Sequence, residues 1–159
     1  MHKIKELYSR EEAKKIKESF WTTFGQYMAP IPSEDGEKVT WVNYKTGIRF
    51  LFFRMEATNK IAQIGIEIAN PDDGIRALLF EQFKEYAKVL EAELGEEWIW
   101  DDSFYDDYGK QTARIYTEIR GLSVFKKEDW PELITFFKPR IIALDSFWST
   151  AKHGFELFK

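Results

Sequence analysis

Charged and polar side chains alternate with apolar ones in three segments rich in β-branched and aromatic residues. Segments 48–56, 60–69 and 112–120 have the alternation typical of strands that are buried on one face only. If Thr58-Asn59 forms a two-residue turn, Met55 faces Ala62 on the buried side and Phe52 faces Gly65 on the other. The second side, called the mixed face below, then carries Phe50, Phe52, Arg54, Glu56, Gln63, Glu67, Arg114, Tyr116 and Glu118.

Two interpretations of the mixed face stay open. The simpler one is an amphipathic sheet with solvated ion pairs between neighbouring strands, which antiparallel sheets commonly have. The other is a binding face on which charges converge on a ligand. The candidate binding residues are Phe50, Arg54, Glu56, Gln63, Glu67, Arg114, Tyr116 and Glu118.

Carboxylates on this face also suggest metal-dependent nuclease chemistry, in which acidic side chains on adjacent strands hold Mg²⁺ or Mn²⁺. The order of helix, three-strand meander, helix and strand is similar to the core of restriction-endonuclease-like nucleases. Glu56 and Glu67 could bind the ion, with Glu11 or Glu12 as a third ligand. However, Ala69 stands where that family places lysine, and the assumed register puts Glu56 and Glu67 too far apart to share one ion. A divergent nuclease is therefore the alternative function, and Mg²⁺ or Mn²⁺ is a cofactor only under that alternative.

Phe50 and Phe52 beside Arg54 resemble an aromatic platform on which bases of a nucleic acid stack. The net charge of −4 disfavours a general nucleic-acid binder and leaves room for a local basic patch. Packing of these phenylalanines in the core is the favoured interpretation, because the chain contains 14 Phe, 7 Tyr and 6 Trp.

Residues 91–109 contain eight carboxylates and no cation. The segment could hold a divalent ion or meet a basic partner, but its spacing does not match a calcium loop, so we favour a solvated surface. Trp98 and Trp100 share one strand face and are expected in the core.

Other familiar catalytic groups are missing from the sequence. There is no Cys and there are only two histidines, His2 and His153, near opposite ends of the chain. No Gly-rich phosphate loop and no nucleophile motif is present. We therefore assign no catalytic residue, no metal ligand and no cofactor.

The elements that must position these residues follow from periodicity and punctuation. Helices are expected over 10–28, from Asn70-Pro71 to Gly95, and from Asp129 onward with a kink or break at Pro139. Strands are expected over 39–44, 48–56, 60–69, 97–101 and 112–120. The fold class is α+β, with about five mostly antiparallel strands and three main helices in the order α-β-β-β-α-β-β-α. Residues 1–159 are expected to form a single domain without a membrane segment.

Several segments together resemble a known family, and Trp41 to Gly47, Leu94 to Trp98, and Phe137 to Trp148 are the clearest of them. Phe20 to Gly25 and Trp130 to Ile134 add to the likeness. The chain is identified as a member of the bacterial family catalogued as domain of unknown function 4268. This resemblance implies a small prokaryotic, cytoplasmic protein linked to restriction or defence. The association of this family, together with the missing motifs and the heavy aromatic content, suggests a non-catalytic interaction or ligand-binding module. Its partner is unknown and could be a second copy or another protein.

Overall fold

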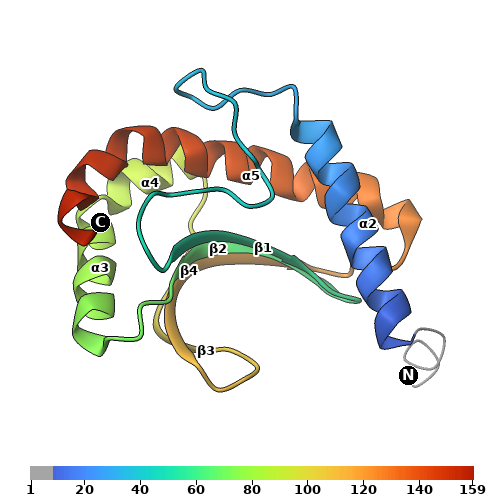
Figure 1. The fold of residues 1–159 in the computed structure, drawn as a ribbon, viewed down its shortest axis with the longest axis horizontal. Helices are drawn as coiled ribbons and strands as arrows, with labels where there is room; N and C mark the ends of the chain where they lie inside the picture. The colour runs from blue at the N-terminus through green and yellow to red at the C-terminus, as the bar shows by residue number, and fades with distance from the viewer. Residues whose placement is uncertain (1–8) are drawn as a thin grey trace.

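The computed structural model describes residues 9–159, and these contain four α-helices and one four-stranded sheet (Figure 1). In chain order the elements are α2 (Arg10–Met28), β1 (Leu51–Ala57), β2 (Ile61–Ile68), α3 (Asp73–Glu85), α4 (Ala87–Leu94), β3 (Ile99–Tyr105), β4 (Gln111–Arg120) and α5 (Trp130–Ala151). Short 3₁₀ turns, Lys127–Asp129 and Lys152–Phe158, flank α5. The α+β class is thus confirmed.

The first helix, α2, has the predicted limits. Ser9 caps it by accepting a hydrogen bond from the backbone N–H of Glu12 at 3.1 Å. The helix ends at Met28, two residues before Pro30, which has no backbone N–H with which to continue the helical hydrogen bonds. Phe20, Phe24 and Met28 are fully buried on the face that meets the core.

The sheet is antiparallel throughout, in the order β1-β2-β4-β3, so β1 and β3 are its edges. The prediction of about five strands is wrong because residues 39–44 form no strand. Their aromatic side chains pack against the core instead. Trp41 is buried and its indole N–H donates to the Ile31 carbonyl, and the Tyr44 ring stacks on Phe53. A single bridge between Lys45 and Phe52 joins the end of this segment to the sheet ladder.

The β1–β2 hairpin differs from the expected register by two residues. Met55 pairs with Ile64, not Ala62, because the turn spans four residues between Ala57 and Ala62. The Thr58 hydroxyl accepts hydrogen bonds from the N–H groups of Lys60 and Ile61 and stabilises this wider turn. A shift of two residues keeps each side chain on its predicted face, because side chains alternate with period two.

The helix expected up to Gly95 is two helices, so the prediction of three main helices is wrong. The chain leaves helical geometry at Tyr86, with φ −102° and ψ 12°. The Tyr86 ring packs between Phe147 and Phe155. Gly95 ends α4 in the left-handed conformation, as predicted.

The helices lie on one side of the sheet, and the β3–β4 hairpin bends away from them (Figure 1). Ile64, Ile66 and Ile115 are fully buried beneath this helical layer. The last helix, α5, runs unbroken through Pro139, and the Arg140 guanidinium donates to the Phe136 carbonyl in the preceding turn. Of the kink or break expected at Pro139, the break is therefore absent. The opposite side of the sheet is the mixed face.

Candidate ligand-binding site

Glu67 is the centre of the mixed face, where it joins two arginines from the strands on either side. Arg54 Nε on β1 donates to Glu67 Oε1 at 3.1 Å. Arg114 on β4 donates from Nη2 to Glu67 Oε2 at 2.6 Å. Arg114 lies directly opposite Glu67, whereas Arg54 reaches it diagonally from the position opposite Gly65. Three strands are therefore tied by one carboxylate.

A second set of bonds extends this cluster along the strands. Arg114 Nη1 donates to Gln63 Oε1 at 2.6 Å, and Gln63 Nε2 donates to Glu118 Oε1 at 3.1 Å. Glu118 in turn pairs with Arg120 at 3.0 Å. Glu56 joins the cluster through an ion pair with Arg114. Hydrogen bonds and ion pairs thus connect six of the eight candidate residues. We call these six the arginine network: Arg54, Glu56, Gln63, Glu67, Arg114 and Glu118.

Glu56 and Glu67 lie closer together than the assumed register implied. Both carboxylates reach Arg114 Nη2, at 3.5 Å and 2.6 Å, so the expectation that the hairpin holds them far apart is wrong. The group that lies between the Glu56 and Glu67 carboxylates is the Arg114 guanidinium. Among residues 9–159, no group of three or more His, Asp or Glu side chains has a geometry that could hold a metal ion.

The centre of the network, formed by Gln63, Glu67 and Arg114, is buried, whereas Arg54 and Glu56 on β1 are exposed. Arg114 is 7% exposed, and its guanidinium lies 4.3 Å from the centre of the Phe104 ring on β3. Arg114 Nε is buried without a hydrogen-bond partner among the described residues. Phe104 also contacts Tyr116 edge-on. Burial, and then the charges of Glu118 and Asp101, raise the pKa of Tyr116, so this phenol stays protonated at neutral pH.

Gly65 allows the strands of the mixed face to lie this close. A Cβ atom on Gly65 would lie 2.5 Å from the Tyr116 Cβ, so a larger residue has no room there. The residue opposite Gly65 on β1 is Arg54 and not Phe52, which corrects the expected pairing of Phe52 with Gly65. The mixed face is thus a packed, mutually bonded surface.

The remaining candidate, Phe50, lies immediately before the first residue of β1, where the chain enters the sheet. It has a positive φ of 66°, which costs a residue with a side chain roughly 1 kcal/mol or more. Its carbonyl nevertheless accepts the ladder hydrogen bond from Ala69 N–H. Strained backbone of this kind is commonest at functional sites. Phe50 belongs to a hollow beside the edge strand.

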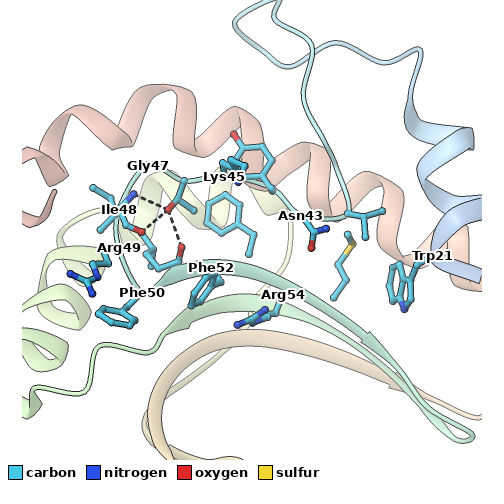
Figure 2. Close-up of a pocket in the computed structure, with 15 residues that line it drawn as sticks. Trp21, Asn43, Lys45, Gly47, Ile48, Arg49, Phe50, Phe52 and Arg54 are labelled. Atoms are coloured by element: carbon cyan, nitrogen blue, oxygen red, sulfur yellow. Dashed lines mark hydrogen bonds between the residues drawn. The ribbon is translucent and has the colours of Figure 1, made fainter. Parts of the chain in front are cut away.

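This hollow, called the β1 pocket, has a volume of about 720 Å³ and runs along the outer edge of β1. Figure 2 shows Trp21 at one end and Arg49 with Phe50 at the other. Residues 42–50 form its second wall, and Phe52 and Arg54 lie along β1 between the ends (Figure 2). Arg54 and Phe52 therefore belong both to the mixed face and to this pocket.

The β1 pocket is positively charged. Lys45, Arg49 and Arg54 line it, and none of the described residues that line it is acidic. Within residues 9–159, Lys45 and Arg49 have no carboxylate within ion-pair distance, whereas Arg54 forms an ion pair with Glu67. The arginines lie over aromatic rings, Arg49 at 4.9 Å from Phe50 and Arg54 at 4.1 Å from Phe52.

The wall formed by residues 42–50 is fixed to α5 by hydrogen bonds. Tyr44 donates to Asp145 Oδ1, and Trp148 Nε1 donates to the Thr46 carbonyl at 2.9 Å. Burial, together with the bond to Asp145, raises the pKa of Tyr44, so the phenol remains a donor at any ordinary pH. The Thr46 hydroxyl donates to the Leu51 carbonyl and so joins the wall to β1. The pocket is held open by the fold itself.

Residues 16–152 match the family model described as domain of unknown function (DUF4268). The chain belongs to the DUF4268 family. Comparison with curated proteins and with solved structures gives no match. The matched region of this DUF4268 chain contains the arginine network, the β1 pocket and the α5 residues that fix its wall.

The sequence pointed to the mixed face of this DUF4268 chain but missed Trp21, Lys45 and Arg49. Segment 41–47 was expected to be a strand followed by a turn, so its cations were not placed beside β1. One signal was available: the lysine and arginine flank Gly47 with no acidic residue between them.

The acidic segment of the DUF4268 chain lies at the other edge of the sheet. Asp101 and Asp102 are on β3, and Asp106 and Asp107 are in the turn that follows.

Trp98 is buried, and Trp100 packs edge-on against Phe80, which confirms that both contribute to the core. His153 is exposed in the last turn of the chain. None of the described helices is long and apolar enough to span a membrane.

Proposed function

We propose that this DUF4268 domain is a non-catalytic binding module whose β1 pocket takes an anionic ligand that carries a flat ring. One observation carries the proposal: three cations and no carboxylate line a pocket in a chain whose net charge is −4. Arginine and lysine are the side chains that bind phosphate and carboxylate groups. A pocket with this charge selects against neutral and cationic ligands.

Aromatic side chains in the pocket select for a ligand that carries a flat ring. Trp21, Phe50 and Phe52 line the same pocket, and a planar ring gains dispersion energy when it stacks on them. The volume of about 720 Å³ lies in the range of small-molecule sites, roughly 300–1,000 Å³. Because the wall is fixed by Tyr44 and Thr46, little conformational entropy is lost on binding.

The nuclease alternative has less support. Glu56 and Glu67 do approach each other, but both are engaged by Arg114, and Glu67 also by Arg54. A divalent ion would have to displace the buried Arg114 guanidinium, which would then lack a carboxylate partner. A role in restriction or defence, in bacteria, is part of the proposal and rests on the family resemblance alone.

Calorimetric titration with adenosine 5′-diphosphate tests the proposal, with pyrophosphate and adenosine as probes of the charge and the ring alone. We expect the diphosphate to bind more tightly than either. The double variant Lys45→Gln/Arg49→Gln should weaken its binding about tenfold or more, which corresponds to the loss of about 1.4 kcal/mol.

The matched control is Lys84→Gln/Lys88→Gln, which removes two exposed charges that do not line the pocket. Its affinity should equal that of the wild type. Equal affinity of the pocket variant, or no binding of the diphosphate at millimolar concentration, would contradict the proposal.

A further inference from the structure

A second hollow continues the β1 pocket along α2. Its volume is about 820 Å³, and it shares Trp21 and Val42 with the first. Because two lining residues are common to both, the hollows meet at the Trp21 indole. The surface available to a ligand therefore runs from the start of α2, past Trp21, and along the edge of β1.

The α2 hollow has the same charge as the β1 pocket. Arg10, Lys14 and Lys17 line it, and they share one face of α2 with Trp21 because they are spaced by four, three and four residues. Glu18 is the one carboxylate among its described lining residues, and it lies 4.0 Å from Lys14 with both side chains mostly exposed. Such an exposed pair neutralises little of the local potential.

Trp21 stands at the junction as a fixed aromatic surface. Its ring packs edge-on against Phe20 at 4.9 Å and lies 5.1 Å from the Phe137 ring. The side chain is nevertheless only half-buried, so part of it faces the hollows. A ring held on one side by the core and open on the other is suited to stacking with a base.

The length of the surface decides between a small ligand and a polymer. From Arg10 to Trp21 the helix alone rises about 16 Å, and Phe50 to Arg54 adds about 13 Å along the strand. One nucleotide cannot contact both ends. A chain of regularly spaced phosphates that alternate with flat bases can, and single-stranded nucleic acid has this chemistry.

Resting on the proposed function, we infer that the two hollows form one track for single-stranded nucleic acid. The α2 cations and the β1-pocket cations would contact its backbone, while Trp21 and Phe52 stack on its bases. A duplex is disfavoured because its bases are already stacked on one another and their faces are hidden. The carboxylates of the β3–β4 hairpin lie at the opposite edge of the sheet from β1, so they do not oppose the phosphates on the track.

Fluorescence anisotropy with a labelled dodecamer of deoxythymidine tests the inference, with a 12-base-pair duplex and a glutamate dodecapeptide as competitors. Lys14→Gln/Lys17→Gln changes exposed or half-exposed helix positions, so the fold should be kept, and circular dichroism checks this. This variant should bind the dodecamer about tenfold more weakly and bind adenosine 5′-diphosphate unchanged. Its plot of log affinity against log salt should be shallower by about 0.7 for each phosphate that the variant no longer neutralises.

The outcomes separate the two proposals. If the dodecamer does not bind, or binds equally to the α2 variant, while the diphosphate still depends on Lys45 and Arg49, the track is wrong and the pocket stands. If neither probe binds, both are wrong. Equal or better competition by the duplex or by the glutamate peptide would also overturn the inference. Lys84→Gln/Lys88→Gln again serves as the matched control and should bind the dodecamer as the wild type does.

Discussion

At the scale of the residue, Glu67 is the side chain on which the mixed face depends most. Its two carboxylate oxygens bind two arginines, and its side chain is 10% exposed. We expect Glu67→Ala to lower the free energy of unfolding by about 3–5 kcal/mol, because the buried Arg114 loses its shortest ion pair. Urea denaturation measures the change.

The control is Glu81→Gln, which breaks the exposed pair with Lys84 and should change stability by less than about 0.5 kcal/mol. A loss below about 1 kcal/mol for Glu67→Ala would show that Glu56 or solvent replaces the missing carboxylate. The expected loss of unfolding free energy, which assumes that Arg114 stays buried without its Glu67 partner, would then be wrong.

The sheet face of each side chain could be predicted from the sequence, because side chains alternate with period two and an error of two residues in the strand register leaves each on the same face. Arg54, Glu67 and Arg114 were placed on one face although the hairpin turn is wider than expected. The partner of each residue could not be predicted, since it depends on hydrogen bonds of Thr58 that a turn motif does not specify. This register error also produced the wrong separation of Glu56 from Glu67.

At the scale of the element, α5 is joined to the segment that links α4 to β3. Arg140 donates from Nε and Nη2 to the two oxygens of Glu96, both at 2.9 Å. Partial burial acts to raise the pKa of Glu96, but the hydrogen bonds of Arg140 and Trp98 outweigh it and hold that pKa below its ordinary value of 4.5. The folded state therefore favours the carboxylate.

Glu96→Gln tests this junction through the pH dependence of stability. Because the folded pKa is lowered, the stabilisation is complete above the ordinary pKa of 4.5 and is lost as pH falls through the folded value. The difference in unfolding free energy between wild type and variant should therefore be largest near pH 7 and shrink below pH 4.5. A difference that stays constant from pH 7 to pH 3 would contradict the assigned role of the charge.

Element limits were predictable where capping residues mark them, as at Ser9 and Gly95. They were not predictable where tertiary packing decides. The break at Tyr86 has no glycine or proline beside it, and its ring fits between Phe147 and Phe155 from the other end of the chain. Residues 39–44 have strand-like composition, yet Trp41 and Tyr44 satisfy their polar atoms outside the sheet.

At the scale of the whole molecule, the pocket wall depends on contacts between distant parts of the chain. Asp145 is 4% exposed and accepts from Tyr44 and from the Glu34 N–H. Tyr44→Phe removes one donor to this buried carboxylate and should destabilise the protein by about 1–3 kcal/mol. Hydrogen exchange of the amides in residues 42–50 should become faster.

Tyr27→Phe is the matched control, because Tyr27 is half-exposed and its hydroxyl accepts one long hydrogen bond, from Lys138 at 3.4 Å. Neither stability nor exchange should change in this variant. Unchanged exchange in Tyr44→Phe would show that Trp148 and Thr46 alone hold the wall. Binding of the diphosphate would then be expected to persist as well.

The anchors of the wall also determine when the pocket can form during synthesis. Tyr44 and Thr46 are held by Asp145 and Trp148, which follow them by 101 and 102 positions. At roughly 5–20 residues per second, translation leaves the wall without these anchors for about 5–20 s. A ribosome-bound chain that ends before Asp145 should therefore carry every cation of the pocket and still lack a binding-competent site.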